Sequence, residues 1–144
     1  MRKITNFTNH IIKTGLLSRD TGQKGQNSLI MKPDKLRKLF QKSAVVEWPC
    51  TNERFTLEEH VLANCEYPGE WGGKIVSFLP AAEQTVLNTN VWPTDISTSY
   101  HCVSVIHWKK NKIAALTEYW SDDGPAPQWR QEMGIGKPIK EALK

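Results

Sequence analysis

The sequence predicts an α+β fold in which helices come first and a strongly curved antiparallel sheet follows. In the first part of the chain, apolar residues such as Leu36, Leu39 and Phe40 recur at helical spacing. From Lys74 to Trp120, apolar and polar residues alternate with the period of strands. A chain of 144 residues is long enough for one domain with its own core. Helices across the concave side of a bent sheet would leave a pocket at its open end.

Two signals place the expected helix starts. Pro33 suits the first turn of a helix, because the missing N–H is not needed there. Thr56 is followed three residues later by Glu59, which is the spacing of a capping box. Before residue 70 the sequence therefore predicts a helix over 4–17, a loop over 21–28, a helix from Pro33, a strand over 44–48 and a helix from Thr56.

Four segments with period two follow, and short turns separate them. They cover residues 74–79, 85–92, 98–108 and 112–120. Consecutive strands joined by short turns pair antiparallel, so a meander is expected. The tail, residues 121–144, contains three prolines and three glycines. We expect it to wrap over the body through its apolar side chains, Trp129, Met133 and Ile135.

The charge is distributed unevenly along the chain. Residues 1–43 hold ten Lys and Arg against two acidic residues, whereas residues 44–144 hold nine against thirteen. The basic part has only two aromatic residues and no nucleic-acid-binding motif, which favours a solvated basic face. No apolar run reaches the roughly 20 residues of a membrane span. We therefore expect neither nucleic acid nor a membrane as a partner.

The three cysteines, Cys50, Cys65 and Cys102, are odd in number and lack the spacing of metal ligands. An odd count argues against a disulfide framework and fits the reducing cytoplasm. The N-terminus also lacks the continuous apolar segment of a secretory signal. The expectation is a cytoplasmic protein with no cofactor and no metal site.

The stretch NKIAALTEYWSDDG, residues 111–124, is typical of a long strand followed by a turn. Side chains alternate across a strand, so Leu116, Glu118 and Trp120 share one face. If that face is buried, desolvation raises the pKa of Glu118 and makes it a candidate proton carrier. Alternation taken alone favours a Glu118 that is exposed or tied to a basic partner, because carboxylates are rarely buried.

Several segments together resemble the SnoaL-like branch of the nuclear transport factor two superfamily. They are VVEWPCTNERF, TLEEHVLAN, YPGEW and KIAALTEYWSDDG, followed by WR and MGIGKPI. The resemblance covers residues 34–138 of a single domain, 1–144, and residues 1–32 match it poorly. It implies a cone-shaped α+β barrel, whose curved sheet wraps around N-terminal helices, with a deep apolar pocket and usually a homodimer.

This superfamily includes ketosteroid isomerase, limonene epoxide hydrolase, scytalone dehydratase and polyketide cyclases, but also binding and scaffolding modules, so fold does not decide function. In a comparison with ketosteroid isomerase, Trp48 occupies the position of the catalytic base and Val103 that of an oxyanion-hole Asp. That isomerase mechanism is therefore not expected here. The same comparison implies that the pocket face carries His101, Val103, Leu116, Glu118 and Trp120.

On this basis Glu118 and His101 would form a general acid/base pair in an apolar pocket. A buried hydrogen-bonded pair that only positions the sheet is equally open. Glu47 points away from Trp48 by alternation, and we expect it to pair with a basic residue outside the pocket. For His60 and His107, surface or structural roles are favoured. The residues expected to bind a small apolar or aromatic ligand are Trp48, Tyr67, Trp71, Val103, Leu116 and Trp120.

The expected function is small-molecule binding in an apolar pocket. Its catalytic form would be a cofactor-independent isomerase, cyclase or hydrolase that works by general acid/base catalysis. The alternative is a non-catalytic ligand-binding or protein-interaction module of the same fold.

Overall fold

The computed structural model describes residues 28–29 and 33–139. The predicted helix over 4–17 lies outside the described residues, as does nearly all of the loop over 21–28. The elements are β1 (Ser28–Leu29), α2 (Pro33–Leu39), β2 (Phe40–Trp48), β3 (Glu53–Thr56), α3 (Leu57–Cys65), β4 (Trp71–Pro80), β5 (Gln84–Pro93), β6 (Tyr100–Lys109), β7 (Lys112–Asp122) and α4 (Gln128–Glu132).

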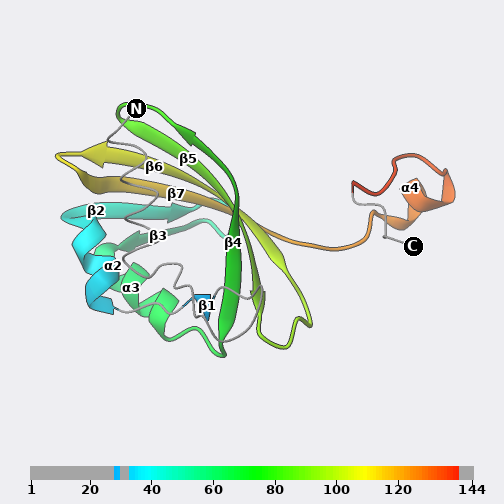
Figure 1. The fold of residues 1–144 in the computed structure, drawn as a ribbon, viewed down its shortest axis with the longest axis horizontal. Helices are drawn as coiled ribbons and strands as arrows, with labels where there is room; N and C mark the ends of the chain where they lie inside the picture. Colours follow the sequence, from blue (N-terminus) through cyan, green and yellow to red (C-terminus); the bar gives the residue numbers. More distant parts are fainter. Residues whose placement is uncertain (1–27, 30–32, 140–144) are drawn as a thin grey trace.

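Seven strands form one mixed sheet in the order β1-β4-β5-β6-β7-β2-β3. Strands β4 to β7 form the predicted antiparallel meander. Beyond the prediction, β2 pairs in parallel with β7, and the short strand β3 pairs antiparallel with β2. The sheet curves around α2 and α3 (Figure 1), but β1 and β3 remain separate edges, so it does not close into a barrel. The α+β class with a curved sheet is confirmed.

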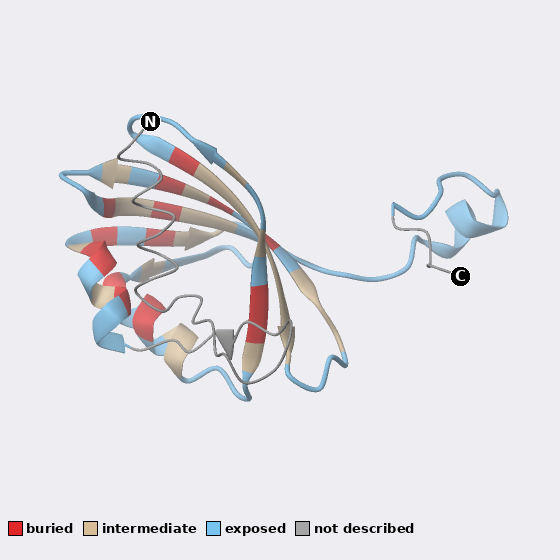
Figure 2. Ribbon diagram, viewed as in Figure 1, coloured by how far each residue is buried: buried red, intermediate tan, exposed pale blue. Residues whose placement is uncertain are grey.

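The core lies where α2 and α3 meet the sheet, and we call this side of the sheet the inner face and the opposite side the outer face. Buried residues concentrate there (Figure 2). Full burial of one aliphatic side chain stabilises the fold by about 1.5–3 kcal/mol. The core residues are Leu36, Leu39, Phe40, Ala44, Val46, Leu57, Val61, Ile106, Ile113 and Leu116.

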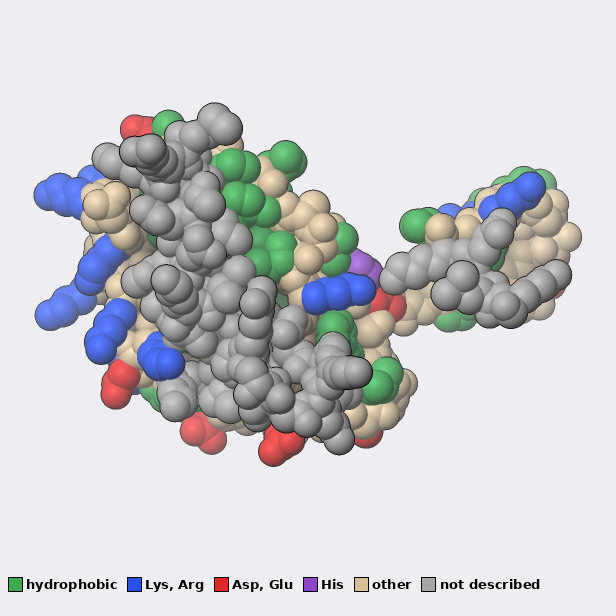
Figure 3. All heavy atoms as spheres, in the orientation of Figure 1, with side chains coloured by type: hydrophobic (Ala, Val, Ile, Leu, Met, Phe, Trp, Pro, Cys, Tyr) green, Lys and Arg blue, Asp and Glu red, His purple; other side chains and the backbone are tan. Residues whose placement is uncertain are grey.

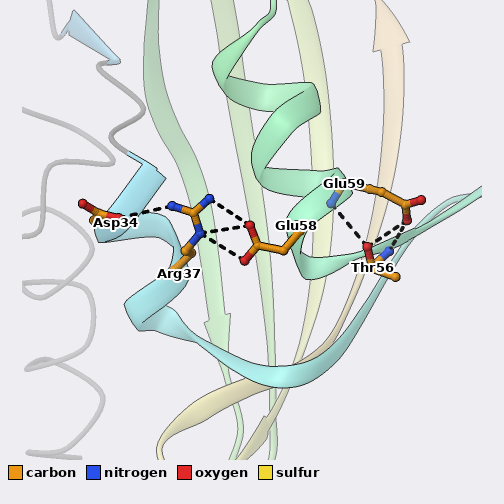
Figure 4. Close-up of polar contacts among 5 residues, drawn as sticks. All are labelled: Asp34, Arg37, Thr56, Glu58 and Glu59. Atoms are coloured by element: carbon orange, nitrogen blue, oxygen red, sulfur yellow. Dashed lines mark hydrogen bonds and ion pairs between the residues drawn. The ribbon is translucent and has the colours of Figure 1, made fainter.

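Local signals in the sequence fix both helices. The predicted capping box opens α3: the Glu59 amide donates to the Thr56 hydroxyl, and the Thr56 amide donates to the Glu59 carboxylate over 2.7 Å. Arg37 of α2 binds Glu58 of α3 at 2.8 Å and Asp34 at 3.2 Å (Figure 4). These exposed ion pairs add little stability, but the pair with Glu58 joins the two helices that cover the inner face, whereas the pair with Asp34 lies within α2.

A bulge in the β6–β7 hairpin decides which side chains face inward. Residues 110–111 form its two-residue turn, with φ of 52° and 61°, as a type I′ turn requires. The pairing then shifts by one residue, which leaves Ala114 without a partner. Beyond the bulge, Ser104 lies opposite Glu118. An unbulged hairpin would place Val103 there instead.

The C-terminal segment stands away from the body (Figure 1), so the expectation that it wraps over the body is wrong. We call residues 123–139 the arm. Pro127 has φ −53° and ψ 144°, and the extended conformation that prolines favour carries the arm outward. Its apolar side chains are therefore exposed: Trp129 by 56%, Met133 by 67% and Ile135 by 49%.

Candidate functional site

Glu118 lies on the inner face of β7, between Leu116 in the core and Trp120. Its carboxylate accepts two hydrogen bonds, one from the indole Nε1–H of Trp48 at 2.8 Å and one from the Ser104 hydroxyl at 3.2 Å. Trp48 comes from β2 and Ser104 from β6. Glu118 therefore connects three neighbouring strands through its side chain alone.

Burial raises the pKa of Glu118 above its ordinary value, although the hydrogen bonds from Trp48 and Ser104 work to lower it. The indole N–H of Trp120 also lowers this pKa, yet it is buried and finds no hydrogen bond of good geometry among the described residues. Desolvation outweighs these donors. A carboxyl group in this condition holds its proton at a higher pH than usual, which is what a general acid or base requires.

Aromatic rings surround this carboxylate. The Trp48 ring packs edge-to-face on three neighbours, with centroid distances of 4.6 Å to Phe55, 6.2 Å to His60 and 6.3 Å to Trp120. Such contacts suit a wall that holds a flat or apolar ligand. The structure thus brings together four of the predicted site residues: Trp48, Leu116, Glu118 and Trp120.

His60 belongs to this interior, although no partner for it is visible in the sequence. It is only 4% exposed, and its ring lies 5.7 Å from that of Phe40. Burial lowers the pKa of His60 to about 4, so the imidazole is neutral at neutral pH. Its spacing from Leu57 and Val61 on α3 was the available signal, because all three share one buried helix face.

His101 and Val103 do not face Glu118, which corrects the predicted acid/base pair. Both lie on the outer face, because the bulge shifts β6 by one residue and directs Cys102 and Ser104 inward. The His101 side chain is 47% exposed, and its Nδ1 lies 2.5 Å from a carboxylate oxygen of Asp123. Val103 is 36% exposed.

Asp123 collects several donors where the arm begins. Besides His101, it accepts hydrogen bonds from the Ser99 hydroxyl and from the Asn90 amide at 3.0 Å. Burial works to raise the pKa of Asp123, but these hydrogen bonds and the nearby His101 outweigh it, so the pKa is lowered. His101 therefore helps to fasten the root of the arm to β5 and β6.

Tyr67 and Trp71 lie together in a separate aromatic cluster. Their ring centroids are 5.1 Å apart, and the Trp71 ring lies 5.8 Å from that of Tyr100. Tyr67 is 56% exposed. Tyr100 precedes Cys102 by two residues on β6 and so shares the inner face with it. The cluster thus continues the inner face toward the start of β6, at Tyr100.

Glu47 lies on the outer face and binds Arg54 at 2.7 Å, which confirms its predicted pairing with a basic residue. Within residues 28–29 and 33–139, no three His, Cys, Asp or Glu side chains are grouped as a metal site requires. No helix in that part of the chain is both long and apolar enough to cross a membrane.

No family model and no curated protein matches the sequence. Solved structures do match the fold. A candidate ketosteroid isomerase from Kribbella flavida superposes with a TM-score of 0.63 at 19% identity, covering 77% of this chain and 80% of that one. A nuclear transport factor two-like protein of unknown function from Burkholderia xenovorans gives 0.61 at 18%, covering 75% and 83%.

An epoxide hydrolase of the limonene epoxide hydrolase-like type from M. tuberculosis gives a TM-score of 0.52 at 10% identity, covering 78% of this chain and 84% of that one. All three proteins are at most 19% identical to this chain, so these matches show a shared architecture and not a shared activity. The chain therefore has the fold of the nuclear transport factor two-like superfamily.

Proposed function

We propose that the protein binds a small apolar or aromatic molecule against the inner face, and that Glu118 exchanges a proton with it. One observation carries the proposal: a carboxyl group with a raised pKa lies among the indoles of Trp48 and Trp120. Chemistry of this kind needs no cofactor and is that of an isomerase, cyclase or hydrolase. Trp48, Leu116 and Trp120 would form the ligand wall, with Tyr67 and Trp71 further along the face.

The proton transfer follows from the two hydrogen bonds. Trp48 and Ser104 hold the carboxylate in one orientation and stabilise its charged form. Desolvation favours the protonated form. Glu118 would therefore be a base that already has its reactive orientation before the substrate proton arrives. Its raised pKa would let it hold that proton and then return it to the substrate. His101 has no part in this step.

A second candidate function is a ligand-binding or interaction module without catalysis. It is favoured by the same hydrogen bonds, because both oxygens of Glu118 already accept internal donors. A carboxylate used only to join β2, β6 and β7 would show that pattern.

A ligand screen by thermal shift comes first, since a molecule that binds only the folded state raises the melting temperature. With a ligand and its turnover in hand, Glu118→Gln separates the two functions. The change keeps the shape of the side chain and removes proton exchange. For an enzyme, ligand affinity should stay within a factor of ten, about 1.4 kcal/mol, while turnover falls roughly 10²-fold or more.

Glu47→Gln is the matched control, because it makes the same chemical change on the outer face beside Trp48. It should leave turnover unaltered. Equal turnover of wild type and Glu118→Gln would exclude Glu118 as the proton carrier. Ligand binding without any conversion by the wild type would favour the module.

We also propose a homodimer that forms through the outer face. Apolar side chains are exposed there, Val45 by 39%, Val103 by 36% and Tyr119 by 47%, and a patch of this kind is typical of an interface.

We also propose that the protein works in the cytoplasm. Cys50 and Cys102 are free thiols, which fits a reducing compartment.

A further inference from the structure

An open groove of about 520 Å³ lies beside β3 and α3, away from Glu118. Its floor is apolar and includes Leu62, which is 59% exposed although it is a large aliphatic residue. Its rim is acidic. Arg54 also lines it, but the 2.7 Å ion pair with Glu47 offsets the charge of that guanidinium. The floor is formed by Phe55, Leu62 and Ala63, and the rim carboxylates are Glu53, Glu59 and Glu66.

The arm carries the complementary features. Trp129 and Met133 are more than half exposed, and hydrophobic side chains lie on the surface of the arm in Figure 3. The guanidinium of Arg130 lies 5.7 Å from the centroid of the Trp129 ring, so a positive charge accompanies the indole. Lys137 adds a second basic residue to the arm, and Glu132, which accepts a hydrogen bond from the Gln128 amide at 2.6 Å, is its one acidic residue after Asp123. An apolar segment bordered by cations fits an apolar floor bordered by carboxylates.

We propose that the arm of one copy docks in the groove of a second copy of this chain. Trp129 and Met133 would cover the floor, while Arg130 and Lys137 would face the acidic rim. Pro125 and Pro127 favour a second copy over the chain's own groove, because proline-rich spacers are stiff and this one leads the arm away from its own body (Figure 1).

Reciprocal docking closes into a symmetric pair, since each copy offers one arm and one groove. Charge and exposure at the arm and the groove alone support this contact. The docking depends neither on proton transfer at Glu118 nor on the outer-face contact around Tyr119, so each of these three proposals can be refuted without the other two.

Photo-crosslinking of the full chain tests the docking. Trp129 is replaced by benzoylphenylalanine, which keeps an aromatic side chain at an exposed position that no core residue contacts. Unlabelled and nitrogen-15-labelled protein are mixed, allowed to exchange subunits, irradiated and digested. Mass spectrometry should find crosslinks from position 129 to residues 53–66 that join light to heavy chains.

Three variants make the test specific. Leu62→Glu places a charge on the exposed floor and should reduce this crosslink at least tenfold, and Glu66→Arg should reduce it by reversing a rim charge. Benzoylphenylalanine in place of Leu79, which is 68% exposed on β4, should give no crosslink to residues 53–66. Crosslinks confined to single chains would overturn the proposal in favour of an arm that folds back. Crosslinks elsewhere, none at all, or no response to Leu62→Glu would also overturn it.

Discussion

Removing the Ser104 hydroxyl tests whether Glu118 is ionised and held by hydrogen bonds in the folded protein. Ser104 is 5% exposed, so Ser104→Ala leaves no room for bulk water to replace the lost donor. A hydrogen bond to a charged group contributes about 1.5–3 kcal/mol, and one between neutral groups about 0.5–1.5 kcal/mol. The free energy of unfolding should therefore fall by about 1.5–3 kcal/mol when Glu118 is charged, and by the smaller amount when it is protonated.

The sign of the pH dependence follows from the pKa. The Ser104 hydrogen bond lowers the folded-state pKa of Glu118, so Ser104→Ala raises that pKa further above its unfolded value. The loss of unfolding free energy caused by Ser104→Ala is therefore largest above the folded-state pKa of Glu118, and it becomes smaller as the pH falls below that pKa. Urea unfolding of wild type and variant at about pH 8 and about pH 4, with unchanged slopes, measures the two differences.

Thr85→Val is the matched control. Thr85 is 4% exposed, and its hydroxyl accepts a hydrogen bond from the Trp108 indole at 2.9 Å without a titrating partner. Its cost should be the same at both pH values. In a Glu118→Gln background, Ser104→Ala should also lose its pH dependence. A cost for Ser104→Ala that is equal at both pH values in the wild-type background would refute the reasoning.

Three other outcomes are expected. Burial lowers the pKa of His60 from 6.5 to about 4, so as the pH falls the unfolded chain binds this proton before the folded chain does. The free energy of unfolding should therefore drop by up to about 3 kcal/mol between pH 6.5 and about pH 4. Urea unfolding of His60→Phe should not show this drop. Tyr119→Glu on the outer face should shift sedimentation at tens of micromolar from dimer to monomer, and a monomeric wild type would contradict the proposed dimer. The thiol of Cys102 is 1% exposed and burial raises its pKa to about 12, so mass spectrometry should find Cys50 alkylated in the native protein and Cys102 only after unfolding.

Local signals predicted well because local contacts produce them. The capping box at Thr56 and Glu59, the helix start at Pro33 and the pairing of Glu47 with a basic residue all depend on side chains close in sequence. The meander from β4 to β7 follows from the same logic, since each strand pairs with the next. Alternation also grouped Leu116, Glu118 and Trp120 correctly, because no irregularity separates these residues within β7.

The failures arise where distant segments or single residues decide. Both faces of β6 carry apolar residues, so alternation alone does not show which face is the inner one. The bulge at Ala114 of β7 turns Cys102 and Ser104 toward the inner face. His101 was therefore assigned to the wrong face. The parallel pairing of β2 with β7 joins segments about 70 residues apart and has no local signature. The tail was expected to cover its own body because apolar residues are usually buried, but extended prolines keep them exposed.

The parallel contact between β2 and β7 also has a consequence for biosynthesis. The Trp48–Glu118 hydrogen bond spans 70 positions, so β2 leaves the ribosome long before its partner strand exists. Until β7 emerges, one edge of β2 has no strand beside it, and the Trp48 indole has no carboxylate to bind. Contacts of such high sequence separation form slowly, and the open edge is a site for aggregation meanwhile. The pairing of β2 with β7 should therefore be a late step of folding, completed only after β7 has been translated.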